Sequence, residues 1–449
     1  SGRFRRPEIS FPSVPKRIIP VASGKGGVGK TTFSVNFALA LSRFAPTVLV
    51  DLDTGTSSVR SSIAAPVHKD LYHFHRKGAA LADCVTGLDA SFDRTGQFRK
   101  FGFVAGPKHF IEELGNPSAE FRRRLSEAVN ALPADYVVLD LRAGLDANVL
   151  DFLPYTNSGM LVVTPNLPQA TLAASDIVKA ILFRTLRLIF APGSVVFNLP
   201  GLADGRDLIH DLLDQAEDVY DDRVKNLDAV LRELKELFGD QPLLRVLEWV
   251  IQDFRIHYVL NMFNGVEESG RSAIDPFVRN IAENVSAGLE MTQLGWIVQD
   301  PRVHRANCAG MPLLLDGEVE RAKPATVDPV LAELESLRSS MLGVERRAPA
   351  RTSGARRAVT PELELAGIES LLGEQLESLK AMFADRRQDS VQQNFTYAVF
   401  RALNLMEPPR LPTEFGMTRL APPERLVTWI LRRMALTSSP TPHAPQLVR

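Results

Sequence analysis

The sequence predicts an α/β fold, in which a mostly parallel, doubly wound sheet carries a helical insert and is followed by a helical C-terminal extension. Short apolar runs bounded by turn residues alternate with helical patterns from about residue 17 to residue 325. A glycine-rich loop, residues 24–29, joins the first apolar run to the first helical pattern. The length of 449 residues is too great for one small core and suggests two or three domains.

The apolar runs define the expected strands. They are Arg17–Ser23, Thr47–Leu52, Phe101–Ala105, Tyr136–Leu141, Gly159–Thr164, Ile256–Met262 and Leu294–Val298. Pro20 is awkward within the first run, because proline cannot donate to a sheet ladder. We interpret it as a strand start or a bulge.

Two helices of the core follow from apolar spacing and capping residues. The first should run from Lys30 to about Phe44, with its buried stripe formed by Phe33, Phe37, Ala40 and Leu41. The second should begin at Asn116-Pro117, which suit the N-cap and the first helical position, and should run towards Ala131.

A long, mainly helical segment separates two core strands, and we assign residues 183–252 to an insert. Within it, residues 201–240 contain twelve Asp or Glu against five Lys or Arg. Such an excess is typical of a solvated face, and otherwise of a docking surface for a basic partner.

The rest of the chain divides by composition. Residues 1–16 form a basic arm, whose opening Ser1-Gly2 looks like the remnant of a cleaved tag, and residues 17–325 form the α/β domain. Residues 326–342 should be a helix, 343–360 an arginine-rich flexible linker, 361–436 a helical region and 437–449 a disordered tail.

The helical region 361–436 contains two amphipathic patterns. From Pro361 to about Asp389, the apolar residues recur at spacings of three and four, so one face should be buried against its own domain, a second copy or a partner; they are Leu365, Ile368, Leu372, Leu376, Leu379 and Phe383. A last helix, residues 424–434, has arginines on its polar side. For this helix, folding onto the protein is favoured over contact with a membrane surface.

Composition narrows the class of protein. The net charge of −1 excludes a global field that would attract nucleic acid or an acidic membrane. Cys84 and Cys308 lie far apart and outside any C-x-x-C, so one chain encodes neither a disulfide framework nor a complete zinc or iron–sulfur site. No apolar run approaches the roughly 18 residues needed to cross a bilayer, and no signal-peptide core is present. A cytoplasmic protein is expected.

The glycine-rich loop carries the strongest motif. Gly24-Lys25-Gly26-Gly27-Val28-Gly29-Lys30-Thr31-Thr32 fits G-x-x-x-x-G-K-[ST], in which backbone N–H groups close around phosphates, the lysine reaches the terminal phosphates and the hydroxyl ligates Mg²⁺. The same letters fit the dinucleotide fingerprint Gly24-x-Gly26-x-x-Gly29, with Asp51 where a ribose-binding acid would stand. A dinucleotide loop needs no Lys-Thr-Thr after its last glycine, so the triphosphate interpretation is favoured. The loop therefore predicts a P-loop NTPase fold.

Three carboxylates end two of the apolar runs. Asp51 and Asp53 close the run Thr47–Leu52, and Asp140 closes the run that begins at Tyr136. Open α/β sheets bind ligands at the carboxyl ends of their strands, so these side chains should lie beside the P-loop. Asp140 suits a metal-binding role and Asp53 the orientation of an attacking water, while the alternative for each is a helix cap.

Together these segments show a family resemblance. The P-loop, Val50-Asp51-Leu52-Asp53 and Asp140-Leu141-Arg142-Ala143-Gly144 resemble the MinD/ParA family of deviant Walker-A P-loop ATPases, which also includes FlhG, Mrp and nitrogenase-iron-protein branches. The resemblance covers residues 15 to about 325. It implies a slow, partner-stimulated ATPase that binds ATP and Mg²⁺ and forms a homodimer sandwiched around two nucleotides.

The resemblance also implies roles for single residues. Lys25 becomes the signature lysine that reaches the partner's nucleotide, Asp53 positions water, Asp51 lies near the metal, and Asp140 with Gly144 forms the second switch. Catalysis is thus assigned to Lys25, Lys30 and Asp53, the metal to Thr31, Asp51 and Asp140, and nucleotide contacts to Gly24, Gly26, Gly27, Val28, Gly29, Lys30, Thr31, Thr32 and Asn261. Asn261 resembles an adenine-contacting asparagine, with a strand-end Asn satisfied by backbone as the alternative, and Gly295–Asp300 resembles the strand and loop around the base.

Departures from the family's pattern leave alternatives open. Arg142 stands where the family has proline, which puts the hydrolysis rate in doubt. Val298 also replaces a proline, and residues 54–58 differ from the family's usual sequence after the first switch aspartate.

The favoured function is a switch that positions or regulates a large assembly through partners bound by the acidic insert or the C-terminal helices. A metabolic or cluster-transfer ATPase and a scaffold with negligible hydrolysis are the alternatives. Nonspecific DNA is a further candidate ligand, because arginines cluster in residues 1–16 and 346–357.

Overall fold

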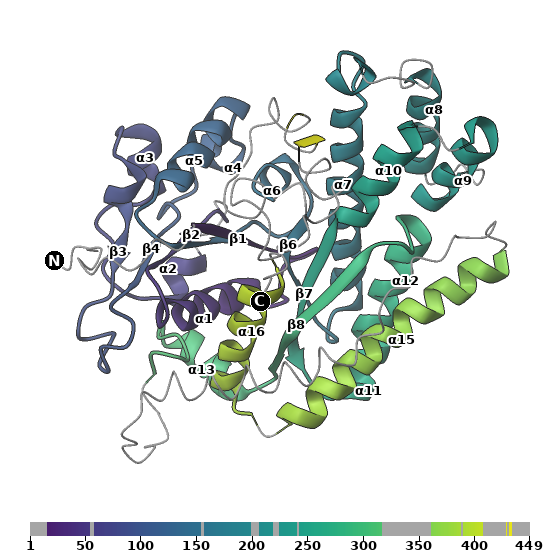
Figure 1. Ribbon diagram of the computed structural model, residues 1–449. Helices are drawn as coiled ribbons and strands as arrows, with labels where there is room; N and C mark the ends of the chain where they lie inside the picture. The colour runs from purple at the N-terminus through teal and green to yellow at the C-terminus, as the bar shows by residue number, and fades with distance from the viewer. Residues whose placement is uncertain are drawn as a thin grey trace, which may run out of the picture.

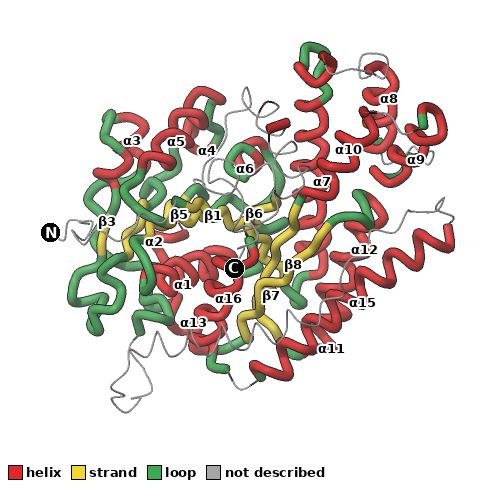
Figure 2. The backbone as a smooth tube through the Cα atoms, viewed as in Figure 1, coloured by secondary structure: helices red, strands yellow, loops and turns green. Residues whose placement is uncertain are grey.

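The computed structural model describes residues 16–53, 58–153, 157–198, 206–218, 224–239, 242–316, 361–387, 389–406, 428 and 431–432 (Figures 1 and 2). The predicted helix 326–342, the linker, most of the helix 424–434 and both terminal segments lie outside these residues. Among the helices that are described, none combines the length and the apolar character needed to cross a membrane.

An eight-stranded sheet forms the centre of the molecule, with strand order β3-β4-β2-β5-β1-β6-β7-β8. Among the strands that the structure describes, β3 alone is antiparallel to its neighbour. The strands are β1 (Arg17–Ala22), β2 (Thr47–Asp51), β3 (Thr86–Gly87), β4 (Phe101–Val104), β5 (Tyr136–Asp140), β6 (Asn157–Val163), β7 (Arg255–Phe263) and β8 (Glu290–Val298). The predicted mostly parallel sheet is therefore confirmed, and β3 is an addition to it.

Pro20 lies inside β1, and the interpretation of it as a strand start or a bulge was wrong. It pairs with Leu139 of β5, whereas β6 pairs with β1 only from Val21 onward. The Leu141 N–H bonds to the Val21 carbonyl, so Val21 faces β5 and Pro20 faces β6. The missing N–H of proline therefore interrupts no bond of either ladder, and the irregularity is in β6, between Asn157 and Met160.

Helices cover both faces of the sheet, and successive strand residues alternate between two apolar clusters. In β1, for example, Ile18 belongs to one cluster and Ile19 to the other. One face is covered by α1 (Lys30–Ser42), α2 (Ser58–Ser62), α13 (Pro301–Cys308) and α16 (Val391–Leu405). The other carries α3 (Leu71–Arg76), η1 (Leu81–Cys84), α4 (Glu112–Gly115), α5 (Ala119–Ala131), α6 (Ala147–Leu150), α7 (Pro168–Ile189), α11 (Val266–Ser269), the π-helical turn η4 (Gly270–Ile274), α12 (Asp275–Asn284) and α15 (Pro361–Arg386).

Two helical predictions need correction. The helix α5 is capped by Ser118, whose hydroxyl accepts from the Phe121 N–H, and not by Asn116, which ends α4. The helix α1 buries nearly its whole circumference and not one stripe, because α16 covers the side that the sheet leaves open.

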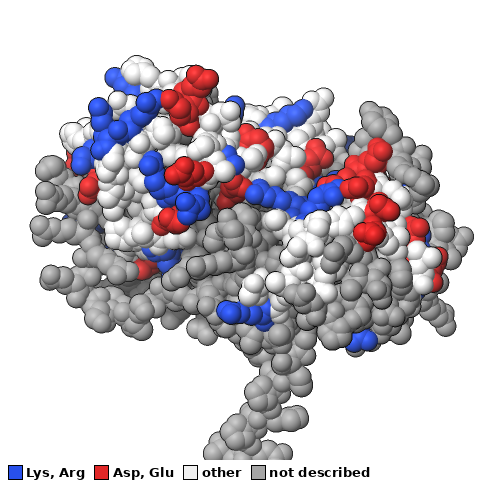
Figure 3. Space-filling view, turned by 90° about the horizontal axis from the view of Figure 1, so that it is seen from above, with Lys and Arg blue, Asp and Glu red and all other residues white. Residues whose placement is uncertain are grey.

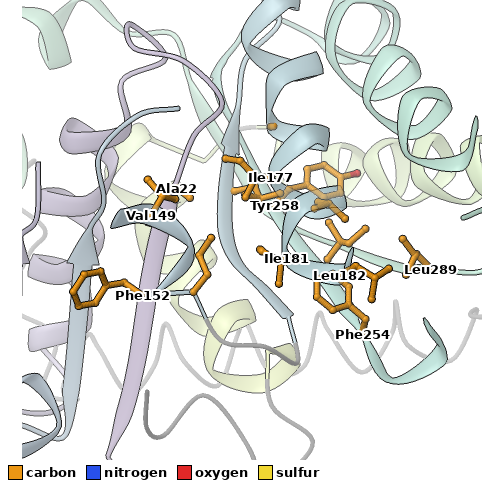
Figure 4. Close-up of a cluster of buried hydrophobic side chains, with 14 of the residues drawn as sticks. Ala22, Val149, Phe152, Ile177, Ile181, Leu182, Phe254, Tyr258 and Leu289 are labelled. Carbon is orange, nitrogen blue, oxygen red and sulfur yellow. The ribbon is translucent and has the colours of Figure 1, made fainter. Parts of the chain in front are cut away.

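The helix α7 continues to Ile189, seven residues into the predicted insert 183–252. Beyond it, the described part of the insert contains η2 (Val195–Asn198), α8 (Arg206–Glu217), α9 (Leu227–Phe238) and α10 (Pro242–Asp253). Apolar residues of the insert, such as Ile209, Val230 and Leu247, belong to the same core cluster as α7. In this cluster Ile177, Ile181 and Leu182 of α7 lie beside Phe254 and Tyr258, at the start of β7 (Figure 4). Because α7 starts at the carboxyl edge of the sheet and runs back along it, the insert lies at the opposite edge from the P-loop (Figure 1).

His257 of β7 is fully buried, and burial lowers its pKa to about 3, helped by the positive charge of Arg255. The unfolded chain takes up a proton near pH 6.5 while the folded chain stays neutral, so stability present above pH 6.5 should fall with decreasing pH down to about 3. We expect a loss of up to about 1.4 kcal/mol per pH unit from this residue.

Urea unfolding at pH 7, 6 and 5 tests this expectation. His257→Gln should have a shallower pH slope than the wild type, whereas the exposed His109→Gln control should keep the wild-type slope. Equal slopes for all three proteins would contradict the prediction.

Candidate functional site

The loop between β1 and α1 is shaped by glycines at two places where no other residue fits. Gly29 has φ 77°, and a Cβ there would stand 2.4 Å from the Asn261 side-chain nitrogen. A Cβ on Gly24 would stand 2.4 Å from the backbone of Ala173 and Ala174 in α7. The loop is therefore held between the first turns of α7 and the end of β7, with its backbone in the form that only glycine adopts readily.

The carboxylate of Asp140 contacts three polar side chains of the P-loop helix α1. Its carboxylate lies 2.7 Å from the Lys30 ammonium and accepts from the Thr31 hydroxyl at 2.7 Å and the Ser34 hydroxyl at 2.8 Å. The side chains of Lys30 and Asp140 are 5% and 0% exposed. Asp140 is the last residue of β5, next to β1, so the strand order brings it beside the P-loop.

This donor set fits a nucleoside triphosphate with Mg²⁺. Lys30 supplies a positive charge for phosphate, and Thr31 and Asp140 supply the oxygen ligands that Mg²⁺ prefers. Backbone N–H groups of a left-handed glycine turn, with Gly27 at φ 87°, are suited to anions.

Asp51 and Asp53 lie at the end of β2 but in different surroundings. Asp51 is fully buried, and its carboxylate accepts backbone N–H groups from Asp53, Val59 and Gly106 at 3.1–3.3 Å. Asp51 thus joins the loops after β2 and β4, and its role as a metal ligand stays a prediction. Asp53 is half-buried beside residues 54–57, which lie outside the described part of the chain.

Asn261 of β7 is close to the P-loop. Its side chain is 7% exposed and donates to the Val28 carbonyl at 2.7 Å. In this structure the amide is therefore bonded to backbone, and contact with adenine stays a prediction.

Lys25 lies at the rim of the loop, with its ammonium 3.4 Å from Gln169 of α7 in an exposed contact. Behind it, the Gly144 N–H donates to the Ser23 carbonyl at 2.9 Å, which joins the loop after β5 to the P-loop. Arg142 points elsewhere, since its guanidinium lies 3.9 Å from Asp146 and 3.5 Å from the Gly115 carbonyl.

Three polar contacts at the site were not predicted. Ser34 follows Lys30 by one helical turn, a spacing that could have identified it as a third group facing Asp140, after Lys30 and Thr31. Ser58 lies 3.0 Å from the Thr31 hydroxyl, and Asn307 of α13 donates to the Thr32 hydroxyl at 2.7 Å. No local pattern in the sequence indicates these last two contacts, because they join distant segments.

The two cysteines lie on different helices and differ in their exposure to solvent. Cys84 is buried in η1, and burial raises the pKa of its thiol to about 11. Cys308 is exposed on α13. Cys84 is therefore poorly suited to supply a thiolate ligand.

Comparisons with known proteins agree with this geometry. A family model described as the CobQ/CobB/MinD/ParA nucleotide binding domain matches residues 19–313. The chain is 26% identical over 163 residues to a putative septum site-determining protein MinD of Oltmannsiellopsis viridis, covering 36% of this chain and 49% of that protein. It is 27% identical over 172 residues to the flagellum site-determining protein YlxH of Helicobacter pylori, covering 36% and 53%.

Among solved structures, the septum site-determining protein MinD from Pyrococcus horikoshii, complexed with Mg-ADP, is similar at 17% identity and a TM-score of 0.39. That match covers 68% of this chain and 90% of the other. The chain spans about half the length of the curated relatives it matches.

Proposed function

Because the chain belongs to the CobQ/CobB/MinD/ParA nucleotide-binding domain family, we propose that it is an ATP-dependent molecular switch that forms a homodimer around two ATP–Mg²⁺ units. It hydrolyses ATP slowly and, through partner proteins in the cytoplasm, positions or regulates a large assembly. The observation that carries the proposal is the contact of the buried Lys30 and the half-buried Thr31 with Asp140, beside a glycine loop in left-handed conformation.

In this proposal different residues bind the phosphates, hold Mg²⁺ and orient the attacking water. The backbone of Gly26–Gly29 and the Lys30 ammonium bind the phosphates, and Thr31 and Asp140 hold Mg²⁺, which when bound neutralises charge on the phosphate oxygens. Before nucleotide binds, Asp140 keeps Lys30 and Thr31 in place, so the incoming phosphates meet a preformed cation and hydroxyl. Asp53 orients the attacking water, and Asp51 shapes the loop that carries Asp53.

A second copy of the chain is the proposed occupant of the surface around Lys25. Three leucines there are unusually exposed for their type, Leu145 at 46%, Leu167 at 41% and Leu172 at 38%. Leu145 follows Gly144, and Leu167 and Leu172 lie at the start of α7, so all three are close to the P-loop. Apolar side chains around a charged residue are typical of a surface that is covered on assembly.

The positioning role rests on the relatives, since the related proteins are named septum site-determining and flagellum site-determining. The partner surface we propose is the acidic insert, whose α8 and α9 lie far from the nucleotide edge and stay accessible when that edge is covered (Figure 1). The predicted alternative, a partner bound by the apolar face of the C-terminal helix 361–389, is weakened because most of this face packs on the chain's own β8 and α12.

The other candidate functions have less support. A cluster-transfer enzyme would need thiolate ligands, and Cys84 is buried with a raised pKa. A scaffold without hydrolysis was suggested by Arg142, yet this side chain contacts Asp146 and does not enter the P-loop. On the face in Figure 3, basic and acidic side chains are interspersed over the described surface, which gives no particular support to DNA binding there.

The proposal predicts opposite effects of two substitutions on ATP-dependent dimerisation. Lys25→Ala should weaken the dimer at least tenfold, because a charge-assisted contact with the partner's nucleotide is lost. Asp53→Ala should still bind ATP and should accumulate as a dimer, because hydrolysis no longer resets it. Light scattering with ATP and Mg²⁺ measures both.

The exposed Lys77→Ala is the matched control, since Lys77 is the C-cap of α3 and its ammonium lies over the Tyr72 ring. A monomer at all concentrations in the wild type and in Asp53→Ala would refute the dimeric switch. Phosphate release by the same proteins separates a slow ATPase from a scaffold.

A further inference from the structure

Ser34 is the most deeply buried of the three side chains that contact the Asp140 carboxylate. It is fully buried, whereas Thr31 is half-buried and the Lys30 side chain is 5% exposed. The Ser34 hydroxyl lies 2.8 Å from Oδ1 of Asp140 and 3.0 Å from the Lys30 carbonyl, and it has one proton to donate. The carboxylate is the stronger acceptor of the two because it carries a charge. The Ser34 hydroxyl therefore donates to Asp140.

The sheet fixes the backbone of Asp140, so the side-chain partners of this residue decide only the direction of its carboxylate. The strand β5 lies between β2 and β1, and the Asp140 carbonyl accepts from the Leu52 N–H at 2.9 Å. Because the carboxylate is 0% exposed, both of its oxygens depend on donors within the protein. Oδ1 accepts from Lys30 and Ser34, and Oδ2 accepts from Thr31.

The proposed function gives two of these three donors new partners in the nucleotide-bound state, since Lys30 binds the phosphates and Thr31 binds Mg²⁺. Ser34 stands one helical turn after Lys30 and is fully buried, so a ligand in the loop does not reach it. Ser34 is then the donor that Asp140 keeps in both states. Its hydrogen bond matters more in the bound state, because a buried charged oxygen that has lost its donors is costly.

We propose that Ser34 is a positioning residue for Asp140 in the nucleotide-bound state. Ser34 holds Oδ1 after Lys30 has turned to the phosphates, and thereby leaves Oδ2, the oxygen beside Thr31, for the metal. The inference rests on the proposed function and extends it to a residue that contacts neither the nucleotide nor Mg²⁺. In the nucleotide-free chain Lys30 still pairs with Oδ1, so the loss of the Ser34 hydroxyl is partly compensated there.

Nucleotide affinity separates this role from a purely structural one. A hydroxyl that served the fold alone would stabilise the free and the bound chain equally, so its removal would leave the affinity unchanged. Ser34→Ala should instead weaken Mg²⁺-ADP binding about fivefold, because the bound chain loses more than the free chain. Ser34→Thr keeps the hydroxyl and should bind with the wild-type affinity, even where its added methyl group lowers the free energy of unfolding.

Ser42→Ala is the matched control for this experiment. Ser42 is also fully buried in α1, and the contact described for its hydroxyl is with the Leu39 carbonyl of the same helix, so this variant should keep the wild-type affinity. Calorimetric titration of the full chain with Mg²⁺-ADP gives the affinities. Wild-type affinity in Ser34→Ala, or an equal loss in Ser42→Ala, would overturn the positioning role alone. A wild-type chain that does not bind Mg²⁺-ADP would overturn the proposed function and this inference with it.

Discussion

Asp140→Ala is expected to lower the free energy of unfolding of the nucleotide-free chain by about 3–5 kcal/mol, the usual result of removing one member of a buried ion pair. The Lys30 ammonium, 5% exposed, would lose the carboxylate that lies 2.7 Å away. The Thr31 and Ser34 hydroxyls would lose the same acceptor. Urea unfolding at neutral pH without nucleotide measures the change.

A second consequence concerns activity. If Asp140 holds Mg²⁺, the same variant should lose Mg²⁺-dependent phosphate release by at least about a hundredfold, the range for removing an electrostatic contact in a reaction centre. Ser34→Ala is the graded control. It removes only one hydrogen bond to Asp140 and should lower stability by about 1 kcal/mol. Asp140→Ala with the stability of Ser34→Ala would show that the ion pair is not the main support of the loop.

Ending the chain at residue 360 is expected to abolish cooperative folding. The two C-terminal helices bury large apolar side chains on β8, α1 and α12, among them Leu371, Leu379, Met382, Val391, Phe395, Tyr397 and Val399. At about 1.5–3 kcal/mol each, their loss matches or exceeds the roughly 5–15 kcal/mol that usually separates folded from unfolded chains. Removal would also expose the edge of β8.

Circular dichroism during heating and the soluble fraction after expression test this expectation. A point variant gives a milder version: Phe395→Ala, whose ring is 1% exposed, should cost about 3–5 kcal/mol. Leu365→Ala in the same extension should be nearly neutral, because Leu365 is 54% exposed and its predicted place on the buried face of the helix was wrong. A truncated chain that melts cooperatively near the wild-type temperature would show that the extension is an accessory domain.

The seven predicted strands were all confirmed because each is an apolar run that is buried on both faces of the sheet, the pattern that a parallel sheet imposes. The strand β3 was missed, since Thr86–Gly87 has only two residues and no apolar run. The cap of α5 was assigned to Asn116 because Asn-Pro is a good start signal. The chain instead uses Ser118, which is also a good N-cap.

The sequence predicted one part of the candidate site and missed another. Lys30, Thr31 and Asp140 were expected to meet, because the motif and the strand ends point to one edge of the sheet, and they do meet in this structure. The full burial of the Asp51 carboxylate beside the half-buried Asp53 was not foreseen. It depends on the Val59 and Gly106 N–H groups, which come from segments whose approach the local sequence does not reveal.

By itself the sequence determined seven of the eight described strands, the P-loop and most of the buried face of α15, because these depend on residue type and spacing along the chain. Which surface covers that face was decided only by the tertiary structure, which packs α15 on β8 and α12 and sets α16 on the P-loop helix. The difference has a physical reason: apolar burial is nondirectional, so an amphipathic helix specifies that it must be covered without specifying by what. Polar contacts with single backbone groups, such as that of Asn394 with Val298, exist only after the chain has folded.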